Sequence, residues 1–360
     1  MSSLKEKMMF KDLKIVELAS VLAGPLVGTF FSELGAEVVK IENASTAGDI
    51  TRKWKLPTES REDISAYYAS ANFNKKVLML NLNDSEDYNL AIKEIKSADI
   101  VIANYKYGDA KKMALDYATL KKLNPSIIYG EINGYGSDQK RTAFDVVLQA
   151  ESGFMFMNGS AESGPIKMPV ALIDILAAHQ LKEGLLCALI KKLKTNEGSN
   201  VTVSLYDAAV SSLANQATNW LMAKHIPQPL GTKHPNIAPY GDMFLTKDQK
   251  YIVLAVGANR QFENLCKVLF LEELLNDIRF QHNSSRVTNR QELNKCIQKK
   301  IKFLSAEDCM KKLSVLNVPA GIVKNMEEVF KNPLTESLIL KETIEGTKAA
   351  KLKTAVFKIS

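Results

Sequence analysis

The sequence predicts an α/β fold: a Rossmann-like large domain with a parallel sheet, together with a smaller α+β domain. In the first half of the chain, short runs of β-branched and other apolar residues alternate with segments whose apolar residues recur at helical spacing. That alternation is typical of βαβ units, whose strands are parallel. After a proline-rich stretch at residues 227–239, helical patterns dominate. A chain of 360 residues is long enough for both domains.

The elements of the large domain follow one another along the chain. We expect strands at residues 14–18, 37–41, 76–82, 100–103, 126–132 and 200–205, and helices at residues 26–34, 87–97 and 115–123. A long helix begins at Asp174, because leucines recur along one stripe up to Leu193, and residues 196–199 end it. The large domain is therefore expected to span residues 1–205 and 319–360.

The smaller domain is expected to begin beyond a connecting helix at residues 206–224. Four prolines between Pro227 and Pro239 predict a stiff, irregular connection at this boundary. Beyond it, the pattern predicts a strand at residues 251–256 and helices at residues 260–270, 290–303, 306–313 and 326–331. We therefore assign residues 225–318 to the small domain and its linkers.

Composition and patterning exclude several classes of protein. With 46% hydrophobic and 24% charged residues, the chain is not disordered or fibrous. Its longest apolar stretch, residues 21–31, is interrupted by Gly24 and Pro25 and is shorter than the ~18–20 residues of a membrane span, so no membrane partner is expected. Residues 1–14 lack the apolar core of a secretory signal, which predicts a cytoplasmic protein.

Cysteine, histidine and charge give no sign of a metal centre or of nucleic acid. The 4 cysteines lack CxxC spacing, and the 4 histidines lack HxH or HExxH spacing, so we expect reduced thiols and no metal. The net charge of +7 comes from lysines and arginines dispersed along the chain. No nucleic-acid partner is therefore expected, although the same excess suits a pocket for a phosphorylated ligand.

Two familiar catalytic patterns are weak or absent. Gly24, Pro25 and Gly28 lie between a strand and a helix, and Glu42 ends the next strand, as in a dinucleotide site, but the GxGxxG spacing is missing. No GxSxG motif is present. His179 lies five residues after Asp174 and points about 140° away from it on a helix. Neither a nicotinamide cofactor nor a nucleophilic triad is therefore favoured.

Asp174 has two interpretations. It follows the apolar run 168–173 and stands where the long helix begins. As an N-cap, its carboxylate accepts backbone N–H groups of the first turn. As a functional group, a carboxylate at a helix N-terminus is kept ionised by the helix dipole, and an ionised carboxylate is a nucleophile without a general base.

Ordered sequence fragments resemble the class III CoA-transferases, a family that includes formyl-CoA transferase, carnitine CoA-transferase and α-methylacyl-CoA racemase. The similarity runs from about residue 13 to the end of the chain. The fragments that carry it lie at residues 15–25, 33–42, 48–52, 74–76, 98–108, 123–125, 134–136, 144–150, 203–208, 234–240 and 318–321, together with Asp174. Their order and spacing make the resemblance specific, although each fragment alone is weak.

The resemblance implies an activity, an assembly and a catalytic residue. It implies a homodimer of two interlocked, ring-shaped chains, and an exchange of CoA between an acyl-CoA and a carboxylic acid with no further cofactor. Asp174 matches the family's catalytic aspartate, which forms an acyl–aspartyl anhydride and then an aspartyl–CoA thioester. The reaction needs no ATP because one thioester is exchanged for another, and it requires that water be kept from the anhydride.

The resemblance also implies a set of CoA contacts, and Arg141 is our own addition to it. Lys106 and Lys112 could meet the phosphates of CoA, and Tyr105 could lie against the adenine, although solvated lysines and a packed tyrosine are equally ordinary. The complete expected set is Leu22, Ala23, Leu82, Asn83, Asn104, Tyr105, Lys106, Lys112, Arg141, Thr142 and Asp145.

Some positions depart from the family pattern. Where racemase relatives carry a Gly-His-Asp motif, this chain has Ala143, Phe144 and Asp145, and a phenylalanine cannot exchange a proton. Transfer is therefore favoured over racemisation. At another position, Asn43 stands where some relatives place a basic residue. An acyl-CoA racemase or epimerase, and a CoA-binding member of the fold without catalysis, remain the alternatives.

Overall fold

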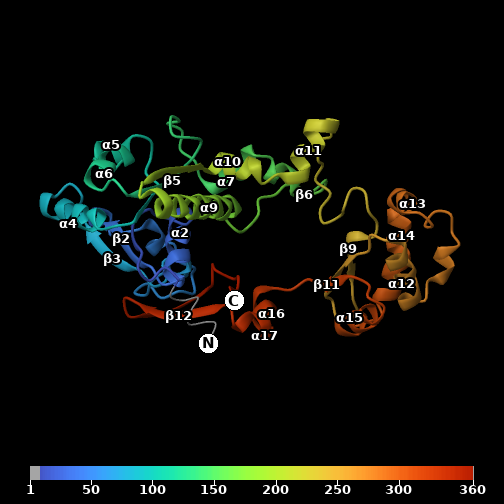
Figure 1. Ribbon diagram of the computed structural model, residues 1–360. Helices are drawn as coiled ribbons and strands as arrows, with labels where there is room; N and C mark the ends of the chain where they lie inside the picture. The colour runs from blue at the N-terminus through green and yellow to red at the C-terminus, as the bar shows by residue number, and fades with distance from the viewer. Residues whose placement is uncertain (1–8, 360) are drawn as a thin grey trace. The chain divides into compact units, whose positions relative to one another are not determined.

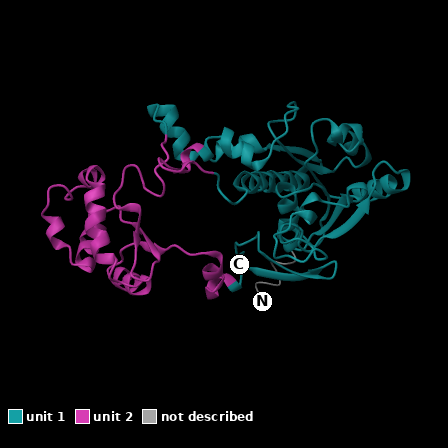
Figure 2. Ribbon diagram, turned by 180° about the vertical axis from the view of Figure 1, so that it is seen from behind, with its two compact units in different colours: residues 1–155, 167–226, 336–360 teal, residues 156–166, 227–335 magenta. Residues whose placement is uncertain are grey.

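The computed structural model describes residues 9–359 and divides the chain into two compact units (Figure 2). The first unit contains the residues up to 155, residues 167–226 and those from 336 onward, and the second contains residues 156–166 and 227–335. The segment 206–224, which the sequence suggested as a connection, thus belongs to the first unit. Residues 319–335 belong to the second unit rather than to the first.

A six-stranded sheet forms the centre of the first unit. The strand order is β3-β2-β1-β4-β5-β8, and every neighbouring pair is parallel. The α/β class and the parallel sheet are therefore confirmed, with small shifts of the strand ends. The strands are β1 (Lys14–Leu18), β2 (Glu37–Asn43), β3 (Lys76–Leu80), β4 (Ile100–Ala103), β5 (Ile128–Asn133) and β8 (Ser199–Ser204).

Helices cover both faces of this sheet (Figure 1). Successive strand residues point to opposite faces, so Ile15 and Ile100 join one buried cluster while Val16 and Val101 join another. The first cluster includes residues of α2 and α9, and the second includes residues of α4 and α6. These helices are α2 (Ala23–Glu33), α4 (Ser85–Lys96), α6 (Tyr117–Leu123) and α9 (Leu172–Thr195).

Shorter elements complete the first unit. A hairpin of β12 and β13 is fastened to it by Glu33, which accepts the backbone N–H groups of Thr354 and Ala355 at 2.8 and 3.0 Å. The remaining elements of this unit are η1 (Ala44–Thr46), η2 (Ile50–Lys53), α3 (Ala66–Ala71), α5 (Asp109–Lys112), α7 (Asp145–Glu151), α10 (Leu205–Ser211), α11 (Ala214–Ala223), β12 (Ile339–Ile344) and β13 (Thr347–Leu352), with α8 (Phe154–Met157) at the boundary.

Two helix predictions were wrong in detail. The single helix expected at residues 206–224 is two helices, α10 and α11, because Ala214 has a left-handed φ of 46° that an α-helix cannot continue through. The helix expected from residue 26 begins at Ala23, so Pro25 is its third residue. Proline is tolerated there because the first N–H groups of a helix have no partner within it.

The second unit is built on a three-stranded antiparallel sheet of order β11-β10-β9. Its core joins Phe244 and Ile252 of the sheet to Leu265, Leu293 and Leu313 of three helices. The elements are β9 (Tyr240–Leu245), β10 (Tyr251–Ala255), β11 (Ala320–Ile322), α12 (Asn259–Leu269), η3 (Glu272–Leu275), α13 (Asn283–Thr288), α14 (Arg290–Ile301), α15 (Ala306–Val315), α16 (Met326–Phe330), the hairpin β6 (Gly159–Ser160) and β7 (Gly164–Pro165), and α17 (Pro333–Glu336) at the boundary.

Membrane-spanning and metal-binding features were searched for in residues 9–359. None of the helices there combines the length and the apolar character needed to cross a membrane. In the same residues, no group of three or more His, Cys, Asp and Glu side chains is arranged to hold a metal ion.

Candidate active site

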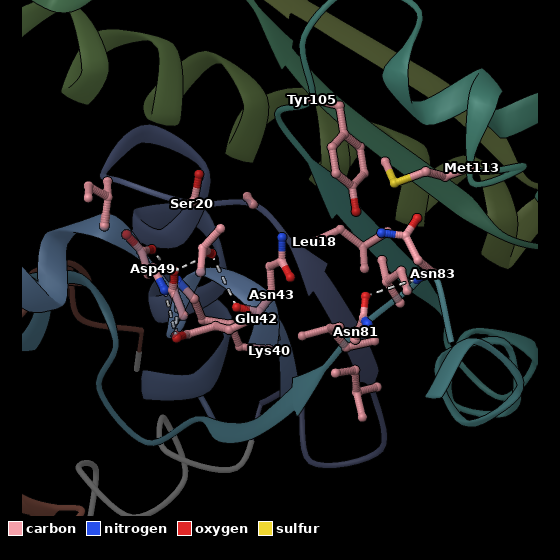
Figure 3. A pocket seen from close by; sticks show the side chains of 17 residues that line it. Leu18, Ser20, Lys40, Glu42, Asn43, Asp49, Asn81, Asn83, Tyr105 and Met113 are labelled. Carbon is pink, nitrogen blue, oxygen red and sulfur yellow. Dashed lines mark hydrogen bonds and ion pairs between the residues drawn. The ribbon is translucent and has the colours of Figure 1, made fainter. Parts of the chain in front are cut away.

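Two cavities lie beside each other at the carboxyl edge of the parallel sheet. We call the larger one, with a volume of about 700 Å³, the Asp174 pocket, and the smaller one, of about 420 Å³, the Asn43 pocket. Ser20 and Tyr105 line both, and Figure 3 shows the Asn43 pocket. The strand order reverses at β1, whose neighbours are β2 and β4, and ligands of open α/β sheets bind at such a switch point.

Every residue that the sequence placed in the site lines one of the two cavities. Tyr105 lines both. The Asn43 pocket holds Leu82 and Asn83, beside Asn43 itself. The Asp174 pocket holds Leu22, Ala23, Asn104, Lys106, Lys112, Arg141, Thr142, Asp145 and Asp174.

Asp174 does not cap its helix. It is the third residue of α9, whose N-cap residue is Ala171, and the N-cap interpretation was therefore wrong. The capping acceptor comes from another helix: the carboxylate of Asp145, at the start of α7, accepts the backbone N–H of Ile173 at 2.8 Å. The amide of Gln149 donates to the second oxygen of Asp145 at 2.7 Å. Asp145 thus binds a backbone N–H at the start of the helix, and Asp174, which has no capping role, lines the pocket.

Burial controls the charge of Asp174. Desolvation, and next the negative charge of Asp145, raise the pKa of Asp174 to about 7. We expected the helix dipole to keep this group ionised, whereas its burial shifts the pKa upward. Burial, followed by the charges of Asp174, Asp145 and Asp49, also raises the pKa of the Tyr67 phenol to about 12. Near neutral pH, Asp174 is therefore present in both its protonated and its ionised form.

The turn between β1 and α2 has an unusual backbone. Val21 has a left-handed φ of 72°, and among the left-handed non-glycine positions of the described chain it is the one β-branched residue. Such a conformation costs roughly 1–2 kcal/mol for a residue with a Cβ atom. Val21, Leu22 and Ala23 all line the Asp174 pocket. The strained turn is therefore part of the site wall.

Side chains on both sides hold this turn. Both oxygens of Asp49 accept the N–H of Val21, at 3.1 and 3.3 Å. The amide of Asn104 accepts the N–H of Ser20 at 3.0 Å and donates to the Ser20 carbonyl at 2.8 Å. Asn104, which the resemblance places among the CoA contacts, thus binds the backbone of Ser20 and also lines the Asp174 pocket.

A buried chain of alternating charges continues from Asp49. Lys40 pairs with Asp49 at 2.9 Å and with Glu17 at 3.3 Å, and Glu17 pairs with Lys75 at 2.8 Å; the four side chains have no exposed surface. Lys75 also donates to the carbonyl of Pro25 at 2.8 Å. Because the opposing charges outweigh the desolvation of Lys40, its pKa is raised, whereas burial lowers the pKa of Lys75 to about 7.

Cationic side chains stand around the Asp174 pocket. Arg141 pairs with Glu151, lies over the ring of Tyr135, and keeps 56% of its side chain exposed. Lys112 pairs with Asp109 at 3.1 Å on the surface, and Lys106 is exposed. The pocket therefore offers positive groups to an anionic ligand.

Sequence reasoning missed several residues of the site. Glu131 lines the Asp174 pocket, and burial raises the pKa of its carboxyl group. Phe144, which the sequence indicated only as a departure from the racemase motif, also lines it and is 57% exposed. Asp49 lay inside a matched fragment, but nothing in the sequence indicated that it would bind the backbone of Val21.

The comparisons with known proteins identify the family of this chain. Residues 10–360 match the model of a protein family described as CoA-transferase family III. The chain belongs to this family. As a family III CoA-transferase it is an enzyme of the transferase class, so the resemblance and the enzyme class inferred from the sequence are confirmed.

Named relatives and a solved structure cover most of this family III CoA-transferase. The chain is 34% identical to the succinate–glutarate CoA-transferase of Agrobacterium fabrum over 93% of this chain and 84% of that protein. It is 35% identical to the human succinyl-CoA:glutarate CoA-transferase over 90% of this chain and 73% of that protein. A CAIB/BAIF family protein from Brucella suis superposes with a TM-score of 0.86 and 34% identity, covering 96% of this chain and 91% of that one.

Proposed function

We propose that this protein moves CoA between an acyl-CoA thioester and a free carboxylic acid, with Asp174 as the nucleophile. The observation that carries the proposal is a carboxylate in the wall of a large pocket, relieved of any capping role by Asp145. The family membership supplies the reaction class.

The covalent steps that we propose balance without a further reactant. An ionised oxygen of Asp174 attacks the thioester carbonyl, the C–S bond breaks, and CoA leaves as a thiolate while an anhydride forms. The thiolate then attacks the aspartyl carbonyl and releases the donor acid. The acceptor carboxylate attacks the carbonyl of the resulting aspartyl thioester, the C–S bond breaks, and a second anhydride forms with release of the CoA thiolate. The thiolate finally attacks the acceptor's acyl carbonyl in this anhydride, which forms the new acyl-CoA and releases the carboxylate of Asp174.

CoA is proposed to occupy the two adjoining cavities. The nucleotide end fits the Asn43 pocket, where Asn83 and Tyr105 offer polar and aromatic surface. Lys106 and Lys112 stand at the Asp174 pocket, where they can neutralise phosphates. The thioester then lies toward Asp174, and CoA serves as substrate and product rather than as a resident cofactor.

The acid substrate is proposed to be a dicarboxylic acid. The two relatives described above are named for succinate or succinyl-CoA and glutarate, which carry a second carboxylate. In this chain, Arg141 lines the same pocket as Asp174, and 56% of its side chain is exposed. A guanidinium binds a carboxylate through two parallel hydrogen bonds, so Arg141 suits the distal carboxylate.

The protein is proposed to act as a homodimer in the cytoplasm, as the resemblance implies. Helix α11 supports the dimer, because none of its residues is buried, and Leu221 and Met222 are 67% and 83% exposed. An apolar helix surface of this kind is typical of an interface. Light scattering on the purified chain should give twice the monomer mass.

The central test is an exchange assay between a donor CoA thioester and glutarate. Asp174→Ala should abolish the transfer, while binding of CoA, measured by calorimetry, persists because the pocket walls remain. Asp308→Asn, at an exposed first-turn aspartate of α15, is the matched control and should transfer at the normal rate. Full activity of Asp174→Ala would refute the assignment.

A second assay tests the class of acid. Arg141→Gln should weaken use of glutarate, and should leave unchanged the slower use of valerate, which has the same chain length and one carboxylate. An equal loss of activity with both acids would show that Arg141 does not bind the distal carboxylate.

A further inference from the structure

A chain of buried charged side chains binds the backbone between β1 and α2, next to the Asp174 pocket. We propose that Asp49 is a positioning residue: it holds Val21 in its left-handed conformation and so fixes the wall formed by residues 21–23 against the thioester. This inference rests on the proposed function for its kinetic part. Its structural part, the restraint on Val21, is independent of any activity.

The first step of the argument is the need for a restraint. A valine disfavours φ of 72° because its Cβ approaches the following carbonyl group. Left to itself, the turn would relax toward negative φ and move the backbone of Leu22 and Ala23. Such a conformation persists only where the surroundings determine it, and backbone of this kind gathers at functional sites.

The second step is the restraint itself. Both oxygens of Asp49 accept the N–H of Val21. The position of Asp49 is itself fixed by Thr51, whose N–H and hydroxyl donate to Oδ1 at 3.0 and 2.8 Å. Lys40 donates to Oδ2 of the same carboxylate at 2.9 Å (Figure 3). With its side chain fully buried, Asp49 has no alternative partner in solvent.

The third step is that the same charges hold the far end of the turn. The chain Asp49, Lys40, Glu17 and Lys75 ends at the carbonyl of Pro25, which accepts from Lys75 at 2.8 Å. The turn is thus fastened at the N–H of Val21 and at the carbonyl of Pro25. Glu17 and Lys40 face each other in the register of β1 and β2, so the sheet sets the distance between the two ends.

The fourth step connects the turn to the chemistry. Residues 21–23 and Asp174 line one cavity, so a movement of the turn changes the space in which the thioester meets the carboxylate. An error of about 1 Å in such placement lowers rates by roughly 100-fold. We therefore expect the loss of the restraint to lower kcat more than it changes the KM for the acyl-CoA.

The test uses a rescue that a merely structural role of Asp49 would not allow. Asp49→Ala should lower kcat about 10- to 100-fold. Val21→Gly is the reference variant for the rescue, because glycine adopts the left-handed conformation without a restraint. The double variant Asp49→Ala, Val21→Gly should recover most of the lost kcat. A double variant as slow as Asp49→Ala would overturn the proposal.

A second variant covers the case in which Asp49→Ala does not fold. Asn104 holds Ser20 from the exposed side, so Asn104→Ala should fold, lower kcat, and be rescued by Val21→Gly in the same way. A slow Asn104→Ala that Val21→Gly does not rescue, or an Asn104→Ala with full activity, would contradict the proposal.

Hydrogen exchange separates this inference from the proposed function. The Val21 amide should exchange at least tenfold faster in Asp49→Ala, or in Asn104→Ala if the former does not fold, than in the normal chain. If that acceleration appears while the normal chain transfers no CoA, the proposed function fails and the restraint stands. If the normal chain transfers CoA and the Val21 amide is as protected in these variants as in the normal chain, the inference about the restraint fails and the proposed function stands.

Discussion

Asp145 accepts the backbone N–H of Ile173 at 2.8 Å and thereby caps the helix on which Asp174 stands. The two carboxylates consequently have different tasks. Asp145 is tied to backbone and to Gln149, whereas Asp174 is desolvated and lies beside the negative charge of Asp145. Neighbouring acids with different environments are a common arrangement in catalytic sites.

The pH dependence of transfer should follow the ionisation of Asp174. The nucleophile must be ionised, and its pKa is raised to about 7, so kcat/KM should rise with pH through about 7. Asp145→Asn keeps an oxygen for Ile173 and removes the negative charge, so the midpoint should move to lower pH. Asp109→Asn, which removes a charge elsewhere on the pocket wall, is the control and should leave the midpoint in place. A profile that is flat between pH 5 and 8 would contradict this expectation.

The ionisation of Asp174 should affect stability in the opposite direction from activity: the free energy of unfolding should fall as pH rises. Between about pH 4 and 7 the folded chain binds a proton at Asp174 that the unfolded chain does not, so this group lowers the free energy of unfolding as pH rises. Asp174→Asn should therefore be more stable than the normal chain at pH 8, by up to about 4 kcal/mol, and about equal at pH 4. Urea unfolding at the two pH values measures this, and equal differences at both would speak against a raised pKa.

The buried charge chain should be far more sensitive than surface ion pairs. Lys40→Met leaves Glu17 and Asp49 buried without their shared cation and should lower the free energy of unfolding by about 3–5 kcal/mol. Lys331→Met breaks an exposed pair with Glu327 and should change it by less than about 0.5 kcal/mol. Denaturant unfolding measures the free energy of unfolding of both variants. Similar small decreases in the two would show that the four charged side chains are not buried as described.

Gly28 should be indispensable because of the same network. A Cβ there would lie 2.0 Å from Oε2 of Glu17, which Lys40 and Lys75 keep in place. Gly28→Ala should therefore lower the free energy of unfolding by about 2–4 kcal/mol, through overpacking and loss of the ion pairs. At Gly257 the nearest atoms to an added Cβ are at 3.8 Å or beyond, so Gly257→Ala is the matched control and should change it little. Comparable losses in the two variants would contradict the placement of Glu17.

Racemisation should be absent. Phe144 stands in the pocket where racemase relatives carry histidine, and it offers no group to return a proton to the α-carbon. A chiral 2-methylacyl-CoA kept with the enzyme in deuterium oxide should gain no deuterium at that carbon by mass spectrometry. Incorporation at a rate comparable to transfer would favour the racemase alternative.

Local patterns predicted the first half of the fold well. The strands of the parallel sheet are apolar runs between helical segments, and each is present in the structure. Helix boundaries were harder to predict where long-range contacts set them. The break between α10 and α11 depends on a left-handed alanine, which no local signal predicts.

The site was predicted through the family resemblance rather than through spacing. Asp174 was recognised at the start of a helix, but that helix is capped by Asp145, 29 residues earlier, so the sequence could not show that Asp174 has no capping role and is desolvated. Lys40 appeared as an ordinary strand residue. Its burial follows from facing Glu17 across two strands, which depends on their register.

The most direct measurement of the central claim is mass spectrometry of the protein after reaction with an acyl-CoA and trapping with hydroxylamine or borohydride. We expect a modification on the peptide that contains Asp174, formed at the rate of transfer and absent from Asp174→Asn. Transfer at full rate with no modification of that peptide, or with the modification on another residue, would contradict the assignment of Asp174 as the nucleophile.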